Sequence, residues 1–236
     1  MKVRDAVVDD APAMGRVMVE SFLAAHRGQM PETAFQKRVE EWTPEVSAGG
    51  WARALAQVSD GNPEGDAILV AEGDDSDLVG LVSGGAAEHE VNGPVAEISA
   101  LYVLPSRHGR GIGRSLLRAA AGNLARLGFA ELRVGVLSVN LSARAFYEAM
   151  GGREIGQGTF DEEGYLLPMT IYTWPDITRL GFPERTPPAD NRPRLEGQRG
   201  DREPEALLRA GREAGHTPRP KGRQHRLHQA VRELPR

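Results

Sequence analysis

The chain has 236 residues, of which 40% are hydrophobic, a net charge of −4 and no cysteine. The lack of cysteine excludes disulfides, thiolate zinc sites and a cysteine nucleophile. The first residues, MKVRDAVVDDA, are acidic where a secretory signal would need an apolar run, and no stretch approaches the roughly 20 apolar residues of a membrane span. We therefore expect a cytoplasmic protein that stays out of the membrane, with one globular domain and an extension.

Charge is distributed unevenly along the chain. Residues 1–184 hold 16 basic and 26 acidic residues, whereas residues 185–236 hold 13 basic and 7 acidic residues and seven of the 16 prolines. No aromatic residue follows Phe182, so this end cannot bury enough apolar surface to offset the entropy of ordering it. We predict a folded domain over residues 1–177 and a disordered, Arg- and Pro-rich tail over residues 178–236.

The first half of the domain predicts a strand, a helix and a polar insertion, followed by a hairpin. Residues 3–8 form the strand, and an aspartate, Asp9 or Asp10, is the N-cap of a helix with apolar residues at helical spacing. A more polar segment then begins at Pro31, where we expect one or two amphipathic helices joined by a break at Gly49–Gly50. Two runs rich in β-forming residues flank an acidic turn and predict the hairpin, at 67–72 and 78–83.

The second half alternates strands with helices. We predict strands at 96–103, 132–137 and 165–174, with one helix in each interval. The first helix follows Gly113 and ends at Gly128, a residue suited to a left-handed C-terminal position. Its apolar face consists of Leu116, Leu117, Ala120, Ala121, Leu124 and Leu127. The second helix runs from about Ser142 to Met150 and stops at Gly151–Gly152.

A glycine-rich loop, RHGRGIGRS at residues 107–115, joins the strand at 96–103 to the first of these helices. Its glycines let backbone amides approach an anion, and the helix N-terminus adds its positive dipole end. The loop is neither a dinucleotide-binding motif nor a Walker loop, because Arg114 and His108 stand where those motifs need glycine or lysine. A pyrophosphate site is one interpretation, with cationic charge from Arg107, Arg110 and Arg114. A glycine-rich turn with solvated arginines is the other.

Two motifs together resemble the GCN5-related N-acetyltransferase (GNAT) superfamily. Residues 108–113 resemble its pyrophosphate signature [QR]-x-x-G-x-[GA], with His108 in place of Gln or Arg. The second motif is N-x-x-[AS]-x-x-x-Y-E-x-x-G, and its positions are filled by Asn140, Ala143, Tyr147, Glu148 and Gly151. The resemblance is dense over 96–156, loose over 3–95 and absent beyond about 177.

The resemblance implies an α+β (mixed α/β) fold with a central, mostly antiparallel, twisted sheet of six or seven strands, splayed around an acetyl-CoA site and flanked by helices. It also implies an enzyme that transfers the acetyl group of acetyl-CoA directly to a primary amine, with no covalent enzyme intermediate. The residues expected to bind acetyl-CoA are Leu101, Tyr102, Val103, His108, Gly109, Arg110, Gly111, Ile112, Gly113, Arg114 and Asn140.

Acetyl transfer to an amine needs a base for the ammonium and an acid for the departing thiolate. By resemblance, Tyr147 is the acid, and Glu97 is the base because it stands in the A-E-I context of the histone acetyltransferase branch. Alternation places Glu97, Ser99, Leu101 and Val103 on one face of their strand. A solvated Glu97, with water as the base, is the alternative. The glutamate that ribosomal-protein acetyltransferases carry on the following strand is replaced here by Gly135.

Other functions remain open at this stage. A non-catalytic acyl-CoA sensor would keep the loop, although the retention of Glu97 and Tyr147 argues against it. The basic tail could bind nucleic acid, but its interspersed Glu and Pro favour a passive extension. No metal site is expected, since His225 and His228 lack further ligands. The acceptor amine, of a small molecule or a protein, is expected to be cationic given the acidic body, and a homodimer is conceivable.

Overall fold

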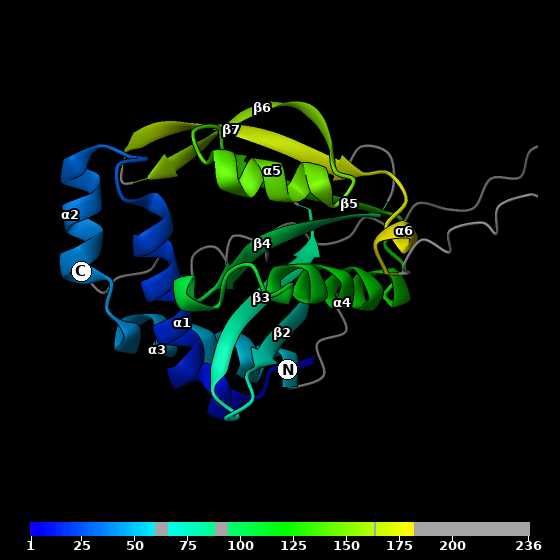
Figure 1. The fold of residues 1–236 in the computed structure, drawn as a ribbon, viewed down its shortest axis with the longest axis horizontal. Coiled ribbons are helices and arrows are strands. Elements are labelled where there is room, and N and C mark those ends of the chain that lie inside the picture. The colour runs from blue at the N-terminus through cyan, green and yellow to red at the C-terminus, as the bar shows by residue number, and fades with distance from the viewer. Residues whose placement is uncertain (60–65, 88–93, 163, 182–236) are drawn as a thin grey trace, which may run out of the picture.

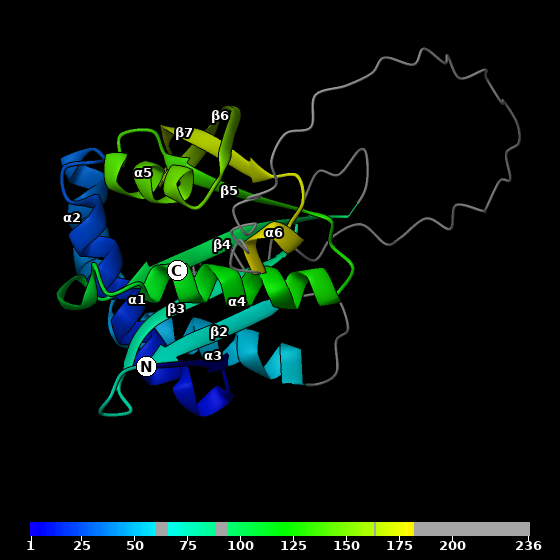
Figure 2. The ribbon, with the colours of Figure 1, turned by 45° about the vertical axis from the view of Figure 1, so that its right-hand side comes forward.

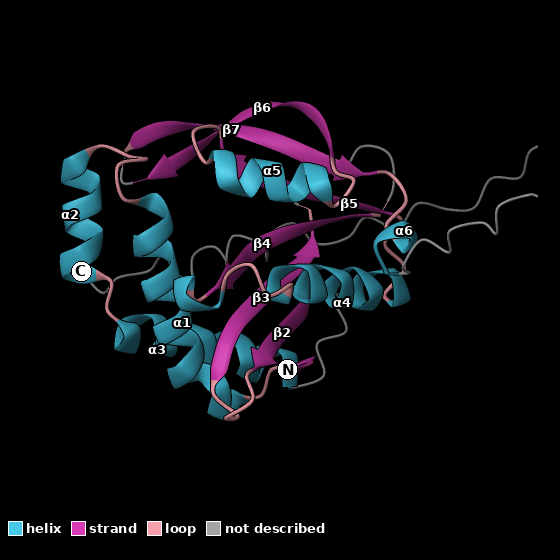
Figure 3. Cartoon of the chain, in the orientation of Figure 1, coloured by secondary structure: helices cyan, strands magenta, loops and turns pink. Residues whose placement is uncertain are grey.

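The computed structural model describes residues 1–59, 66–87, 94–162 and 164–181. Within these residues one seven-stranded sheet forms the centre of the molecule, with helices packed around it (Figures 1, 2 and 3). The strands are β1 (Lys2–Asp5), β2 (Ala67–Glu72), β3 (Leu78–Ala86), β4 (Val95–Val103), β5 (Glu131–Leu137), β6 (Arg153–Glu162) and β7 (Tyr165–Trp174). The helices are α1 (Ala11–His26), α2 (Glu32–Glu41), α3 (Pro44–Ser59), α4 (Ile112–Arg126), α5 (Leu141–Ala149) and α6 (Thr178–Gly181), with 3-10 turns at Val8–Asp10 and Pro105–Arg107.

The strands lie in the order β1, β2, β3, β4, β5, β7, β6, and every neighbouring pair is antiparallel except β4 with β5. This confirms the predicted α+β fold with a mostly antiparallel sheet. The predicted hairpin is also confirmed as β2 and β3. Both strands are almost wholly buried, because α4 packs on β2, β3 and β4 while α1 packs on β3 and β4.

Helix α4 has the predicted apolar face, with one exception. Five of the six expected core residues are fully buried, namely Leu116, Leu117, Ala120, Ala121 and Leu124. Leu127 was expected to join them, but it lies in the C-cap position and is 50% exposed. The residue after it, Gly128, has the predicted left-handed conformation with φ +95°.

Helices α1 and α3 pack so closely that the predicted break at Gly49–Gly50 is wrong. A Cβ on Gly15 of α1 would stand 2.3 Å from the carbonyl oxygen of Pro44 and 2.7 Å from the amide nitrogen of Ala48. Because this packing stabilises α3, the helix runs through both glycines despite their low helix propensity. The break falls instead between α2 and α3, where Pro44 begins the second helix.

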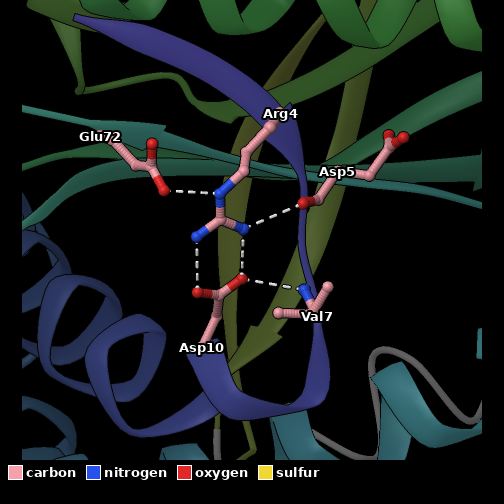
Figure 4. A network of polar contacts seen from close by, with 5 residues as sticks. All are labelled: Arg4, Asp5, Val7, Asp10 and Glu72. Carbon is pink, nitrogen blue, oxygen red and sulfur yellow. Dashed lines mark hydrogen bonds and ion pairs between the residues drawn. The ribbon is translucent and has the colours of Figure 1, made fainter. Parts of the chain in front are cut away.

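The N-terminal strand is shorter than predicted, and Asp10 does not cap α1 with its side chain. Its carboxylate accepts hydrogen bonds from Arg4 Nη1 at 2.6 Å and Nη2 at 2.8 Å, and from the Val7 amide at 2.8 Å. Arg4 Nε also donates to Glu72 Oε1 on β2 at 2.6 Å (Figure 4). The arginine between two carboxylates therefore joins the start of α1 to the edge of the sheet.

Strand β6 was not predicted from the sequence. It pairs with β7 along its whole length, and together they form a hairpin next to α2, as Figures 1 and 2 show. A hydrogen bond of 2.8 Å between Thr33 Oγ1 of α2 and the Tyr165 hydroxyl of β7 joins the two elements. The β6–β7 hairpin and α2 are therefore in contact, although they are far apart in the sequence.

The described part of the chain ends with α6, which packs on α4. Ile177 and Leu180 are buried there, with exposed fractions of 0% and 3%. Most of the predicted tail, from residue 182 on, lies outside the described residues and includes His225 and His228, so its disorder stays a prediction. None of the described helices combines the length and apolar character needed to cross a membrane.

Candidate active site

A cavity of about 840 Å³ opens where β4 and β5 separate. The two strands pair only from Val95 with Glu131 to Ile98 with Val134. Beyond that point, β4 continues along β3 and β5 continues along β7. The sheet therefore splits in its middle, and the backbone of β4 after Ile98 has no strand partner on the side of β5.

Backbone groups of β4 point into this split. The Leu104 amide donates to Val79 on β3 at 2.9 Å, so the alternation of an antiparallel pair turns the amides of Val103 and Leu101 away from β3. Both residues line the cavity. Tyr102 has the opposite backbone orientation, but it also lines the cavity and contributes its side chain to the wall.

The glycine-rich loop lies at one mouth of the cavity. Gly109 and Gly111 adopt left-handed conformations with φ +74° and +77°, and a Cβ on either would meet no atom within 4 Å. Gly111 is the N-cap of α4, and the first helical bond runs from the Ser115 amide to the Gly111 carbonyl. The amides of residues 112–114 therefore precede the helical ladder and are oriented to receive an anion.

The side chains of the loop divide into two groups. Arg107 and Arg114 line the cavity, whereas Arg110 is exposed and is absent from its lining. His108 bonds the carbonyl oxygen of Val103 through Nε2 at 2.8 Å. Its imidazole thus holds the loop against the end of β4. Ile112 is 4% exposed and anchors the first turn of α4 in the core.

Two residues of the α5 region line the same cavity: Asn140, the N-cap of the helix, and Tyr147 within it. Asn140 Oδ1 accepts from the Ala143 amide at 3.1 Å, which caps the helix and leaves Nδ2 as its second polar atom. Tyr147 is 7% exposed and packs beside Phe146, Tyr172 and Trp174, with ring centroids 5.2 to 6.1 Å away. Burial raises the pKa of the Tyr147 hydroxyl, so it is protonated at neutral pH and can act as a proton donor.

Glu97 is half-buried on β4 and lines the cavity, but the predicted alternation of its strand does not hold. The register with β3 passes from Gly84 opposite Ile98 to Ser83 opposite Ala100, which inserts Ser99 as a bulge. The expected single face of Glu97, Ser99, Leu101 and Val103 is therefore interrupted. Ser99 is exposed, and its hydroxyl lies 2.7 Å from Ser83 Oγ.

Gly135 on β5 also lines the cavity, and the flexible side chain of Met169 lies where its Cβ would stand. A Cβ there would stand 2.0 Å from the terminal methyl carbon of Met169 on β7. Met169 thus fills the space that a larger residue at 135 would occupy. Glu97 remains the predicted carboxylate that lines the cavity.

The cavity wall also contains residues that the sequence analysis missed. Helix α1 contributes His26, helix α2 contributes Arg38 and its C-cap residue Trp42 follows, and the end of β6 contributes Glu162. Arg38 Nε donates to Glu162 Oε1 although 124 positions separate the two residues. No local signal marks this pair, since β6 itself was not predicted.

His26 is held as a neutral group in this wall. It is 8% exposed, and its Nδ1 lies 3.2 Å from Gln29 Oε1, a carbonyl oxygen that requires a donor. Burial lowers the pKa of the imidazole, and the hydrogen bond to Gln29 opposes this only in part. Across the described residues, His, Asp and Glu nowhere form a group of three or more that could hold a metal ion.

Comparison with known proteins agrees with this arrangement. A model of the Acetyltransferase (GNAT) family matches residues 31–152, more than half of the chain. The protein belongs to this family. The match covers α2 to α5 and so includes the loop, Glu97 and Tyr147.

Individual relatives of the family cover most of the chain. An uncharacterized N-acetyltransferase of Bacillus subtilis (strain 168), YuaI, is 25% identical over 183 residues, which are 75% of this chain and 95% of the relative. The PaiA N-acetyltransferase of Thermoplasma acidophilum, solved in complex with coenzyme A, has a TM-score of 0.53 and 22% identity over 72% of this chain and 96% of its own. A phosphinothricin acetyltransferase of Sinorhizobium meliloti, solved with acetyl-CoA, has a TM-score of 0.54 and 22% identity over 74% of this chain and 88% of its own. The similarity to the solved structures concerns the fold.

Proposed function

We propose that the protein transfers the acetyl group of acetyl-CoA to a primary amine, of a small molecule or a protein, without a covalent enzyme intermediate. The observation that carries the proposal is that one cavity is lined by the glycine-rich loop, by the unpaired edge of β4, and by Glu97 and Tyr147. Acetyl transfer from the thioester of acetyl-CoA needs both an anion-binding loop and a pair of acid–base groups. The two structures solved with coenzyme A or acetyl-CoA support this choice of donor.

Acetyl-CoA is placed by three groups of residues in this proposal. The free amides at the start of α4, with Arg107 and Arg114, bind the pyrophosphate. Asn140 donates from Nδ2 to the pantetheine arm. The amides of Leu101 and Val103 lie along the split between β4 and β5, where they can bind the pantetheine carbonyls and the thioester oxygen. This places the thioester between β4 and α5.

Transfer then requires two proton movements. The amine nitrogen attacks the thioester carbon, and Glu97 accepts its proton directly or through a water. The negative charge that develops on the carbonyl oxygen is stabilised by a backbone amide of β4. When the carbon–sulfur bond breaks, the Tyr147 hydroxyl gives its proton to the sulfur. The products are the acetylated amine and coenzyme A with a free thiol.

The experiment that tests this function measures thiol release from acetyl-CoA with and without an amine. The proposal expects release to depend on a primary amine and to match the amount of acetylated amine found by mass spectrometry. A panel of alkylamines, diamines, amino alcohols and lysine-containing peptides covers both acceptor classes. Tight acetyl-CoA binding without amine-dependent release across the panel would instead indicate an acyl-CoA sensor.

A further inference from the structure

A buried ion pair with one unpaired carboxylate oxygen lies in the wall of the cavity. The Glu162 side chain is 1% exposed and that of Arg38 is 9% exposed, and Arg38 Nε bonds Glu162 Oε1. The other oxygen, Glu162 Oε2, is buried and has no hydrogen-bond partner among the described residues. A buried carboxylate oxygen without a hydrogen-bond partner has lost its solvation by water without replacement, so such an atom needs an explanation.

Other unsatisfied atoms gather around the same cavity. Six buried side-chain nitrogen or oxygen atoms lack a partner in the described part of the chain, and four belong to residues that line this cavity. These four are Ser21 Oγ, Trp42 Nε1, Trp51 Nε1 and Glu162 Oε2. Four unpaired atoms on residues that line one cavity indicate a place for a polar group of a ligand, because buried polar atoms are rarely left without a hydrogen-bond partner.

The chemistry of the ion pair limits which kind of polar ligand group can bind there. Arg38 already balances the charge of Glu162, so Oε2 needs a hydrogen-bond donor but no further positive charge. The Trp42 ring lies against Arg38, with Cζ 5.3 Å from the ring centroid, and its Nε1 is a donor that needs an acceptor. A hydroxyl donates one hydrogen bond and accepts others, which suits both atoms.

Apolar and aromatic residues of the cavity walls connect the ion pair to Tyr147. Phe22, Met30 and Phe160 line the cavity, and Tyr102, whose ring centroid is 6.3 Å from that of Phe22, is close enough to Tyr147 to add to the rise that burial causes in the pKa of its hydroxyl. Burial raises the pKa of Tyr102 and the charge of Glu162 raises it further, which indicates that the two side chains are close. A carbon chain could therefore run along these walls from Glu97 to Glu162.

We propose that the acceptor is a primary amine that carries a hydroxyl group at its other end, and that Glu162 and Trp42 bind this hydroxyl. The inference rests on the proposed function, because it concerns the acceptor half of the same cavity. Arg38 is a positioning residue that orients Glu162. The acetylated nitrogen lies near Glu97, and the hydroxyl donates to Glu162 Oε2 and accepts from Trp42 Nε1.

The experiment compares kcat/KM for amines of equal chain length over a series of lengths. Each length is represented by an amino alcohol, an unsubstituted alkylamine, a diamine and an amino carboxylate. At the length that spans the cavity, the amino alcohol should exceed the alkylamine by about 10- to 100-fold, the difference expected when one hydrogen bond to a charged group cannot form.

Variants assign the preference to named residues. In Glu162→Gln, the amide oxygen stays available to Arg38 while an N–H group replaces Oε2, so the hydroxyl hydrogen loses its acceptor. Trp42→Phe keeps an aromatic ring beside Arg38 but removes the indole N–H group together with part of the ring system, and it serves if Glu162→Gln fails to fold. Both variants should lower the ratio of kcat/KM for amino alcohol over alkylamine. Tyr165→Phe removes the bond to Thr33 outside the cavity and should leave the ratio unchanged.

The ratio compares two substrates of one enzyme sample, so a loss of folded protein does not change it. Equal rates for amino alcohol and alkylamine, or a preference for the diamine or amino carboxylate, would overturn the inference and leave acetyl transfer to amines intact. A preference for the amino alcohol that survives both Glu162→Gln and Trp42→Phe would also overturn it. Absence of turnover with every amine would overturn the proposed function, and this inference with it.

Discussion

Exchanging Gly111 for alanine should weaken acetyl-CoA binding, whereas the same exchange at Gly128 should not. The two glycines lie at opposite ends of α4 with φ +77° and +95°, and a Cβ on either meets no atom within 4 Å. Both variants therefore have the same left-handed strain, about 1–2 kcal/mol of unfolding free energy. Only the Cβ at 111 stands beside the free amides of the first helical turn.

The effect on binding follows from the hydrogen bonds at stake. Displacing a phosphate oxygen from one backbone amide removes a charge-assisted hydrogen bond of about 1.5–3 kcal/mol, which raises the Kd about 10- to 150-fold. Isothermal titration with acetyl-CoA measures the Kd, and urea unfolding measures the strain. Gly122→Ala in the middle of α4, where a Cβ is also free of contacts, should bind normally and gain about 0.5–1 kcal/mol of stability.

The reasoning is refuted if Gly111→Ala and Gly128→Ala both bind acetyl-CoA as tightly as the wild type. That result would mean that the start of α4 does not hold the pyrophosphate and that the loop is a turn with solvated arginines. Equal losses of affinity in both variants would instead mean that strain in α4 acts on the site through the helix, without a contact at Gly111.

Three further predictions concern single residues. Tyr147→Phe should lower kcat by a factor of about 10² to 10⁴ with an unchanged Kd for acetyl-CoA. Tyr165→Phe, outside the cavity, should change neither kcat nor Kd. Glu97→Gln should lower activity at neutral pH and recover part of it at high pH, where the amine loses its own proton; an unchanged pH–rate profile would make Glu97 a bystander. The hydrogen bonds from its arginine partner lower the pKa of Asp10, so its contribution to stability is complete above about pH 4 and is lost as the pH falls through the lowered pKa. Asp10→Asn should therefore cost about 1–3 kcal/mol in urea unfolding at pH 7, a difference from wild type that narrows in acid, and the exposed Asp9→Asn should cost little.

The elements nearest the loop were predictable because local patterns specify them. The apolar face of α4, the glycine at 128 and the strand at 96–103 each carry a signal within a few residues. Strand β6 carries a weak signal, since its ten residues include two glycines and mostly polar side chains, and pairing with β7 along its whole length holds it in the sheet. Its existence depends on tertiary pairing more than on propensity.

The residues of the candidate site also divide into those that local sequence patterns predict and those that only the folded chain brings together. Motif positions such as Gly111 and Tyr147 could be named from the sequence, because spacing along one loop and one helix defines them. The Arg38–Glu162 pair joins α2 to β6, and no spacing rule relates residues so far apart. The helix through Gly49–Gly50 was missed for a similar reason, since packing on α1 outweighs the low helix propensity of glycine.

The central claim is that acetyl-CoA and an amine meet in one cavity and react directly. Initial rates measured over a grid of acetyl-CoA and amine concentrations test it, because direct transfer requires both substrates to be bound at once. We predict intersecting lines in the double-reciprocal plot, and no acetyl group on the protein by mass spectrometry after incubation with acetyl-CoA alone. Parallel lines together with an acetylated enzyme would contradict the account, since they would show a covalent intermediate.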